Sequence, residues 1–379
     1  MAAPIRVLLL CDRLDISGGV ERFVCALANY LVDEGMDAAV GSVDSVREDI
    51  LYPLKPQVRV LTGDRKQVAS GEGDSRVARA WRLARTQWRI GRSLNRVIRA
   101  ERPDVIVLNG LTTACSVLAL DRRFAARTIC CDHNHFSARS MLWQRLRGWL
   151  YPSVAAVVSL TEADAARFRA LNARTEVIYN ASGLRADEPC VVDAPIVVAV
   201  GRHVAQKGFD LLVRAWAEVV AAMPDARLRI VGDGPLRASH EELARDLGVS
   251  DSIQWLAPTR DIERQYREAA VFVLSSRYEG MPLALLEAQA LGVPAVSFDC
   301  PTGPGEIVTP ETGRLVTAGD AKGLAAAMVE LLSSASLRER MGRAAIARSK
   351  EVFSPQAHER RWTALIRDVA LRQAYGAAA

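Results

Sequence analysis

The chain has 379 residues, of which half are hydrophobic and a quarter are charged, a composition that excludes an intrinsically disordered chain and fits two domains of about 150 residues. The net charge of +5 arises in residues 1–190, where 27 Lys and Arg outnumber 21 Asp and Glu. Seven cysteines without a Cys-x-x-Cys pair, and no apolar run near the roughly 20 residues of a membrane span, predict a cytoplasmic protein without a disulfide framework, zinc site or membrane-spanning helix.

Short apolar runs alternate with longer amphipathic stretches along the whole chain. We expect strands at 5–11, 37–43, 57–61, 104–108, 127–131, 154–159 and 175–178 and, after a linker at 185–195, at 196–200, 227–231, 252–256, 270–274, 294–298 and 314–316. Several runs are apolar on both faces, as parallel strands covered by helices are. This alternation on both sides of a linker predicts an α/β protein with two doubly wound, Rossmann-like domains.

The first candidate site lies after the first strand, because ligands of open α/β sheets bind outside the carboxyl ends of the strands. Gly18 and Gly19 let a ligand approach the backbone closely, and Glu21 follows them. The amide groups at the start of the next helix suit an anion. The alternative is a plain tight turn in which Ser17 caps the helix.

Residues 76–102 contain nine arginines at spacings of three or four and one acid, Glu101, which predicts a helix with an arginine stripe. Like charges on a solvated helix repel, whereas arginine with flanking tryptophan suits an anionic membrane surface. The candidate membrane-binding residues are Trp81, Arg82, Arg85, Trp88, Arg89 and Arg92. The alternative is a sheet-covering helix with a charged outer face. A nucleic-acid partner is not expected, because aromatic stacking platforms are lacking.

Two of the five histidines follow the strand at 127–131. A histidine at a strand end can hydrogen-bond a substrate hydroxyl or donate to a developing charge, so His133 is a candidate catalytic residue. Asn134 and His135 lie beside it on the same loop. The alternatives are a structural loop histidine and a zinc site, for which a second pair of histidines is missing.

The strand at 196–200 leads into a basic loop that contains Gly201, Arg202 and Lys207. Cations are unfavourable at the start of a helix unless an anion compensates the helix dipole. A diphosphate would compensate it, with arginine providing forked donors and lysine a point charge. The alternative is an ordinary solvated basic loop.

Two carboxylates, Glu279 and Glu287, follow the strand at 270–274. The first lies in a loop and the second about one turn into the next helix, a spacing that lets both face one cleft. Carboxylates accept paired hydrogen bonds from sugar and ribose hydroxyls. The residues between them that start the helix are Gly280, Met281, Pro282 and Leu283. The alternative for Glu287 is an acid on the helix surface.

Prolines and glycines in 298–306 predict a rigid loop at the next strand end.

Together these motifs resemble the retaining family-four glycosyltransferases, over about residues 5–350. The matching motifs are Gly18-Gly19-Val20-Glu21, Gly201-Arg202 with Lys207-Gly208, Val231-Gly232-Asp233-Gly234-Pro235, and Glu279-Gly280-Met281-Pro282-Leu283 ending at Glu287. The run Cys300-Pro301-Thr302-Gly303-Pro304 resembles a subgroup that builds bacterial polysaccharides and glycolipids, commonly from UDP-sugars. That subgroup often has arginine where Gly305 stands here, so the contact made by that arginine is missing.

The resemblance implies the GT-B fold, in which two Rossmann-like domains face a cleft. It implies an acceptor-binding domain at 1–185, a donor-binding domain at 195–354 and a last helix at 355–379 that packs back on the first domain. The catalytic residues it implies are His133, Arg202, Lys207 and Glu279. The donor-binding residues it implies are Gly18, Gly19, Gly201, Gly280, Met281, Pro282, Leu283 and Glu287. On the acceptor side it implies Glu21, Asn134 and His135.

The expected reaction is transfer of a sugar, with retention, from a nucleotide-diphosphate sugar to a hydroxyl of a glycan, glycolipid or lipid-linked acceptor. No cofactor is expected, and no metal, because the sequence contains no Asp-x-Asp motif. A nucleotide-sugar epimerase of the same fold, a soluble acceptor and a non-catalytic sugar-nucleotide-binding protein remain alternatives. A nicotinamide dehydrogenase is excluded, because no Gly-x-Gly-x-x-Gly follows the first strand.

Overall fold

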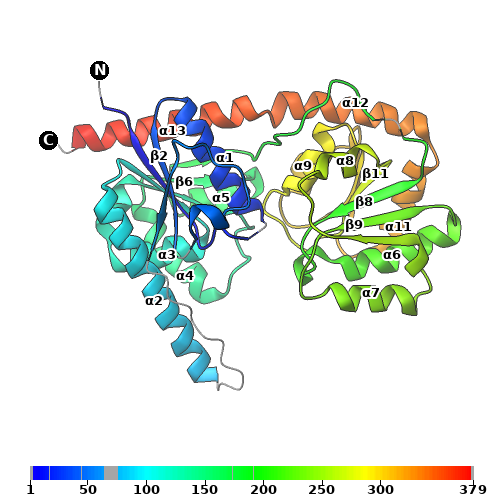
Figure 1. Ribbon diagram of the computed structural model, residues 1–379, viewed down its shortest axis with the longest axis horizontal. Coiled ribbons are helices and arrows are strands. Elements are labelled where there is room, and N and C mark those ends of the chain that lie inside the picture. Colours follow the sequence, from blue (N-terminus) through cyan, green and yellow to red (C-terminus); the bar gives the residue numbers. More distant parts are fainter. Residues whose placement is uncertain are drawn as a thin grey trace. The chain divides into compact units, whose positions relative to one another are not determined.

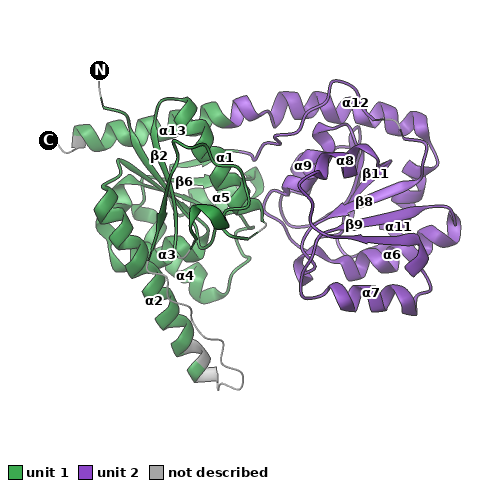
Figure 2. Cartoon of the chain, in the orientation of Figure 1, with its two compact units in different colours: residues 1–178, 359–379 green, residues 179–358 purple. Residues whose placement is uncertain are grey.

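The computed structural model describes residues 3–16, 18–43, 45–63, 76–172, 174–190 and 192–376, and the chain divides into two compact units (Figure 2). Unit 1 comprises Met1–Ile178 with Glu359–Ala379, and unit 2 comprises Tyr179–His358. Ser17, and the side chains of two arginines of the predicted stripe, Arg76 and Arg79, lie outside the described part.

Unit 1 contains a seven-stranded parallel sheet in the order β3-β2-β1-β4-β5-β6-β7 (Figure 1). Its strands are β1 (Arg6–Leu10), β2 (Asp37–Ser42), β3 (Arg59–Thr62), β4 (Val105–Asn109), β5 (Thr128–Cys131), β6 (Ala156–Ser159) and β7 (Thr175–Val177). Its helices are α1 (Gly19–Asp33), α2 (Arg76–Glu101), α3 (Leu111–Leu120), α4 (Met141–Leu150), α5 (Glu162–Arg169) and most of α13 (Pro355–Gly376). The strand order reverses between β1 and β4, where a ligand of such a sheet is expected.

Unit 2 contains a six-stranded parallel sheet in the order β10-β9-β8-β11-β12-β13. Its strands are β8 (Ile196–Val200), β9 (Arg227–Val231), β10 (Ile253–Leu256), β11 (Val271–Leu274), β12 (Ala295–Asp299) and β13 (Gly313–Thr317). Its helices are α6 (Phe209–Ala222), α7 (Arg237–Asp246), α8 (Ile262–Arg267), α9 (Leu283–Ala290), α10 (Pro304–Ile307), α11 (Ala321–Leu332) and α12 (Ala335–Val352). The order reverses between β8 and β11. The prediction of two parallel α/β domains is confirmed, and every strand lies within two residues of its predicted range.

The segment that follows β7 belongs to unit 2 from Tyr179 onward, upstream of the predicted linker. Two hydrogen bonds attach it there: Asn180 Nδ2 donates to the Met281 carbonyl oxygen at 3.2 Å, and the Ala186 amide donates to the Ala290 carbonyl oxygen at 3.1 Å. At the other end of the chain, α13 buries Trp362 and Ile366 within unit 1.

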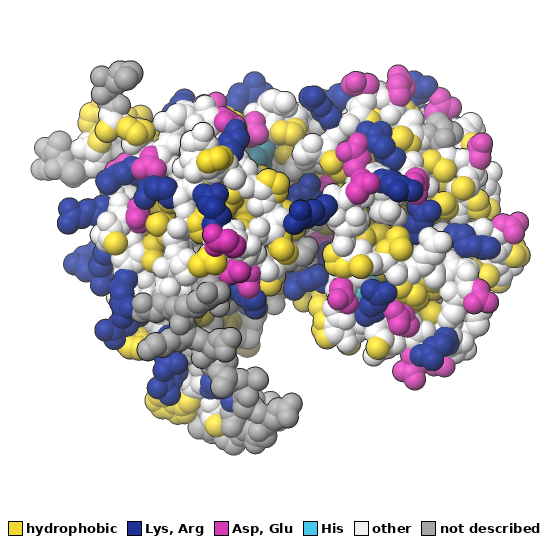
Figure 3. Space-filling model, viewed as in Figure 1, with side chains coloured by type: hydrophobic (Ala, Val, Ile, Leu, Met, Phe, Trp, Pro, Cys, Tyr) yellow, Lys and Arg dark blue, Asp and Glu magenta, His cyan; other side chains and the backbone are white. Residues whose placement is uncertain are grey.

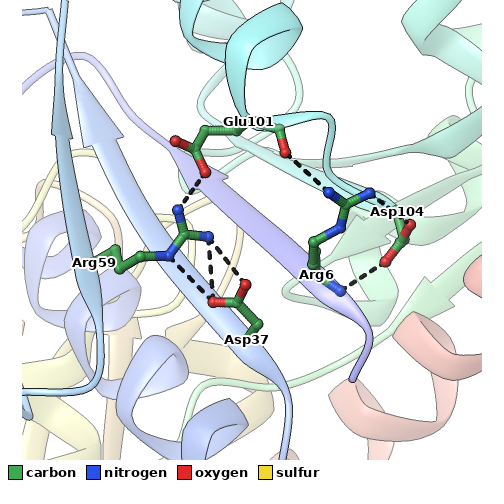
Figure 4. A network of polar contacts seen from close by, with 5 residues as sticks. All are labelled: Arg6, Asp37, Arg59, Glu101 and Asp104. Carbon is green, nitrogen blue, oxygen red and sulfur yellow. Dashed lines mark hydrogen bonds and ion pairs between the residues drawn. The ribbon is translucent and has the colours of Figure 1, made fainter. Parts of the chain in front are cut away.

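The amino ends of the unit 1 strands are fixed by a network of charged side chains (Figure 4). Arg59 pairs with Glu101 and, at 3.2 Å, with Asp37. Arg6 donates to the Glu101 carbonyl oxygen at 3.4 Å, and its amide donates to Asp104 at 2.8 Å. This network attaches the carboxyl end of α2 to the edge of the sheet that lies opposite the carboxyl ends of the strands.

Helix α2 crosses α3 at very close range at Gly91. A Cβ atom there would lie 2.0 Å from the Ser116 carbonyl oxygen, so only glycine fits. Asn95 Nδ2 reinforces the crossing by donating to the Val117 carbonyl oxygen at 3.1 Å. The amino-terminal half of α2 extends beyond the other elements of unit 1 (Figure 1).

We predict that Gly91→Ala lowers the free energy of unfolding by about 1–3 kcal/mol, because the added methyl group forces α2 away from α3. Gly148→Ala on α4 is the matched control, since a Cβ there meets no heavy atom within 4 Å. It should be neutral or stabilising by up to about 1 kcal/mol, from helix propensity alone. Urea unfolding followed by tryptophan fluorescence measures both. Equal stabilities of the two variants would contradict this account of the crossing.

Candidate functional site

The candidate site of unit 2 is built where its strand order reverses. Lys207 lies on the loop after β8, at the end of a short 3-10 helix, η4 (Ala205–Lys207), and Glu279 lies on the loop after β11. Lys207 Nζ donates to Glu279 Oε1 at 2.7 Å. Ser276 Oγ donates to the same oxygen at 2.6 Å, and Gln206 Nε2 lies 3.4 Å from Oε2. The Glu279 carboxylate is buried and accepts hydrogen bonds from donors on both loops.

Glycines let the two loops approach this closely. Gly208 has φ +61°, and a Cβ there would lie 2.2 Å from the Ser275 carbonyl oxygen. Ser275 Oγ in turn donates to the Lys207 carbonyl oxygen at 2.9 Å. The aliphatic part of Lys207 lies against Gly201, where a Cβ would come within 3.1 Å of it. These contacts direct the Lys207 ammonium group along the end of β8.

Arg202 has a different environment from Lys207, although both lie on the loop after β8. Its side chain is exposed, and no described residue forms an ion pair with it. Arg277 holds the other side of the same loop by donating to the Ala205 carbonyl oxygen at 2.8 Å and pairing with Asp210 at 2.6 Å. The guanidinium group of Arg202 is therefore available to an anion from solution.

The loop after β12 packs against the segment 280–283 and supports it. Thr302 Oγ1 donates to the Glu279 carbonyl oxygen at 2.6 Å. Gly303 has φ +91°, and a Cβ there would lie 2.4 Å from the Gly280 carbonyl oxygen. Met281 is buried, and Pro282 immediately precedes α9. The segment 300–303 thus fixes the backbone that carries Glu279.

Glu287 is buried within unit 2 rather than on a helix surface. It lies on α9 with 3% of its surface exposed, and the Tyr266 hydroxyl donates to its Oε2 at 2.8 Å. The alternative of a surface acid is therefore wrong. Tyr266, on α8, was not found from the sequence, since no motif marks it.

In unit 1, His133 follows β5 and is held by a residue from the neighbouring strand. Its Nε2 lies 3.0 Å from Asn109 Oδ1, and Asn109 Nδ2 donates to the Leu10 carbonyl oxygen at 3.2 Å. The amide assignment makes His133 Nε2 the donor. The Phe23 ring packs edge-on against the imidazole at 4.8 Å. Sequence reasoning missed Asn109, although it ends a strand at the switch point and the same criterion would have found it.

The loop that carries His133 is anchored by the buried Asp132. Arg147 donates to its carboxylate at 3.2 Å and the Tyr151 hydroxyl donates at 2.7 Å. Arg147 also donates to the Phe136 carbonyl oxygen at 2.7 Å. Burial raises the pKa of the Asp132 carboxyl, and the Arg147 charge opposes that rise. Arg147 and Tyr151 lie outside any motif, so this anchor could not be predicted from the sequence.

The remaining candidates in unit 1 lie near the ends of β1 and β5. Glu21, in the first turn of α1, is buried, and its carboxylate lies against Gly18, where a Cβ would come within 2.3 Å of Oε2. Gly19 begins α1. Asn134 and His135 are half-buried, and burial lowers the pKa of His135.

The described residues offer neither a metal site nor a membrane-spanning helix. No group of three or more His, Cys, Asp or Glu side chains there is arranged to hold a metal ion. None of the helices described is both long and apolar enough to cross a membrane.

Both units match models of glycosyltransferase families. Residues 17–182 match the model of glycosyltransferase family 4, and residues 194–334 match that of glycosyl transferases group 1. The amylovoran biosynthesis glycosyltransferase AmsD of Erwinia amylovora is 27% identical over 375 residues, covering 95% of this chain and 99% of that protein. The lipopolysaccharide core biosynthesis glycosyltransferase LpsD of Rhizobium meliloti is 29% identical, covering 90% and 92%.

Solved structures show the same fold. Sucrose-phosphate synthase from Thermosynechococcus elongatus has a TM-score of 0.79 at 19% identity, with 96% of this chain and 99% of that one covered. HepE of Anabaena, solved in complex with UDP and glucose, has a TM-score of 0.76 at 17% identity, with 96% and 100% covered.

Proposed function

Because the chain belongs to the family-four glycosyltransferases of the GT-B fold, we propose that it transfers a sugar, with retention and without a metal ion, from a nucleotide-diphosphate sugar to an acceptor hydroxyl. The observation that carries the proposal is the pairing of Lys207 with the buried Glu279 at the switch point of unit 2, with Arg202, which forms no ion pair with a described residue, on the same loop. A UDP-sugar is the proposed donor, and HepE, of similar fold, was solved with UDP.

The chemistry requires stabilisation of the departing diphosphate. As the bond between the anomeric carbon and the phosphate oxygen breaks, negative charge develops on the phosphate, and fixed cations lower the barrier most effectively. Arg202 and Lys207 are the proposed cations. The acceptor hydroxyl attacks the anomeric carbon from the face that the phosphate leaves. Its proton passes to a phosphate oxygen, so the donor becomes a nucleoside diphosphate.

Glu279 is the proposed contact for the sugar hydroxyls. When a phosphate draws Lys207 Nζ toward itself, Ser276 and Gln206 still donate to the Glu279 carboxylate, which therefore keeps its position. Glu287 is the proposed ribose contact, oriented by the Tyr266 hydroxyl. The proposed backbone and apolar contacts of the donor are Gly18, Gly19, Gly201, Gly280, Met281, Pro282 and Leu283.

Unit 1 is the proposed acceptor side, with residues 1–185 binding the acceptor and 195–354 binding the donor. His133 is proposed to contact the reacting sugar, since Asn109 fixes its ring and leaves the imidazole half-buried at the end of β5. Glu21, Asn134 and His135 are proposed to line the acceptor. The activities named for AmsD and LpsD support a glycan or glycolipid acceptor.

The amino-terminal half of α2 supports a lipid-linked acceptor and peripheral binding to the inner leaflet. The second half covers the sheet with the buried Leu94 and Ile98, as the alternative interpretation expected, but the first half does not. Trp81 is 74% exposed, Trp88 is 48% exposed and Leu83, on the face away from the arginines, is 49% exposed. Figure 3 shows Lys and Arg side chains gathered along this helix. Such a surface combines basic groups with apolar anchors for an anionic bilayer.

Helix α4 adds a second apolar surface in the same unit. It begins just beyond the His133 loop, and its first two residues, Met141 and Leu142, are 68% and 62% exposed. Arg139 and Arg145 beside them are exposed as well. An acceptor with a lipid chain and an anionic headgroup would match this surface, which a small soluble acceptor would leave unused.

We predict that Arg202→Ala and Lys207→Ala each lower kcat by about 30- to 1000-fold, because each removes a charge contact to the leaving group worth about 2–4 kcal/mol of barrier. Arg264→Ala on α8, an exposed arginine of the same unit, is the matched control and should keep full activity. Product formation is followed by mass spectrometry. Near-normal rates in both site variants would refute the donor assignment.

In excess EDTA the wild type should stay fully active, and rescue of a lost activity by magnesium or manganese would refute metal independence.

We predict that the protein co-sediments with vesicles of phosphatidylglycerol and phosphatidylcholine at low salt and is released at high salt. Replacing four arginines of α2 by glutamine, each contributing about 1 kcal/mol at an anionic surface, should weaken binding at least about tenfold. The four are Arg82, Arg85, Arg89 and Arg92. The charge-matched control replaces four exposed arginines of unit 2, Arg214, Arg245, Arg260 and Arg340. Wild-type protein that stays in the supernatant at low salt would favour a soluble acceptor instead.

A further inference from the structure

Two buried histidines contact one another, one on the loop that carries Arg202 and Lys207 and the other on α7. His203 follows Arg202 directly and is fully buried, with its ring 5.0 Å from that of Phe209 and 5.7 Å from that of Trp255. His240 lies on α7 and is also buried. The two Nδ1 atoms are 3.0 Å apart.

The hydrogen bond between the two Nδ1 atoms forms only in certain protonation states of the rings. One Nδ1 has to donate and the other has to accept, so the two rings carry different tautomers. If both rings were protonated, two N–H groups would point at each other. His203 Nε2 is buried without a hydrogen-bond partner among the described residues, so a charge on this ring would lack any compensating acceptor. Burial lowers the pKa of both imidazoles, that of His203 to about 4.

The same histidine joins the loop to α7 through its backbone. Its amide donates to the Asp233 carbonyl oxygen at 2.8 Å, and its carbonyl oxygen accepts from the Leu236 amide at 3.0 Å. Gly234 has φ +152°, and a Cβ there would lie 2.7 Å from the His203 carbonyl oxygen. Backbone and side chain of His203 therefore attach the start of the basic loop to the segment that leads into α7.

We propose that His203 and His240 are positioning residues: their uncharged contact holds the loop after β8 in the shape in which Arg202 and Lys207 receive the donor diphosphate. This inference rests on the proposed function for the role of the loop, and on the ring geometry for the contact itself. Neither imidazole takes part in the chemistry. A single proton places an uncompensated charge beside the buried His203 ring, and protonation of both rings also removes the hydrogen bond, so acid weakens the attachment of the loop to α7 and lowers donor affinity.

Other charged groups surround the pair and set how a proton reaches it. Arg237 and, with opposite sign, Asp233 and Glu241 act on His203. Asp210 favours a proton on His240 and Arg277 opposes it. A surface pocket of about 390 Å³, to which Asp210, His240 and Arg277 contribute, opens beside His240.

The direction of the pH effect follows from the lowered pKa values. The unfolded chain binds protons at an ordinary histidine pKa of about 6.5, whereas the folded pair resists them until the pH is lower. The stabilisation is therefore complete above about pH 6.5 and is lost as the pH falls from about 6.5 toward the folded value of about 4 for His203.

The first test compares two variants of the full-length protein at pH 7.5. His240→Leu removes the hydrogen bond, whereas His240→Asn places an amide group at the Nδ1 position and keeps a partner for His203. His240→Leu should increase amide exchange across residues 202–207 and weaken UDP binding about fivefold by calorimetry, the value of one hydrogen bond. His240→Asn should restore both. Wild-type exchange and wild-type UDP affinity in His240→Leu would overturn the proposal.

The second test uses pH. Between pH 7.5 and pH 5 the wild type should lose thermal stability and loop protection, corrected for intrinsic exchange rates, more steeply than the double variant His203→Leu/His240→Leu. Equal slopes would overturn the proposal. If wild-type protein does not bind UDP even at pH 7.5, the proposed donor is wrong, while the exchange and stability measurements still decide whether the histidine pair holds the loop.

Discussion

The ion pair between Lys207 and Glu279 is the interaction on which the candidate site depends. A buried carboxylate is costly unless donors surround it, and removing one partner of a buried pair costs several kcal/mol. Glu279 receives donors from both loops at the switch point, so the two loops have to meet. Their meeting in turn requires glycine at 208, where a Cβ would collide with the Ser275 backbone. A carboxylate that remains anchored while the lysine responds to an anion is what a sugar-diphosphate site needs.

Unit 1 also positions its candidate residue at the switch point of its sheet, but with different side chains. Its switch point brings together the ends of β1 and β4, and the polar residue there, Asn109, orients His133 from the end of β5. The loop of His133 is fixed from behind by the buried pair of Asp132 and Arg147. In both units the candidate side chain is positioned by a neighbouring strand end. This is the reason why parallel α/β sheets place ligands at their carboxyl edge.

The sequence predicted the strands well, because runs such as Ile196–Val200 are apolar on both faces and end at polar or glycine residues. It also marked Arg202, Lys207 and Glu279 as candidates by their places after those strands, and their roles stay predictions. It did not predict that Lys207 and Glu279 would pair, since they lie 72 residues apart and only the strand order makes them neighbours. The contact between His203 and His240 was hidden for the same reason. The burial of Glu287 depends on Tyr266, whose position is set by packing and not by any local pattern.

NMR of the reaction products tests most directly whether the chain moves a sugar from a nucleotide to an acceptor. The wild-type protein is given UDP-, GDP- and ADP-sugars in turn, with and without a bacterial lipid extract and simple glycosides as acceptors. We expect one nucleoside diphosphate to be released for each new glycoside, only when acceptor is present, and the anomeric carbon to keep the configuration of the donor. Nucleotide release without acceptor, as an epimerase would give, or a product of inverted configuration would contradict this expectation.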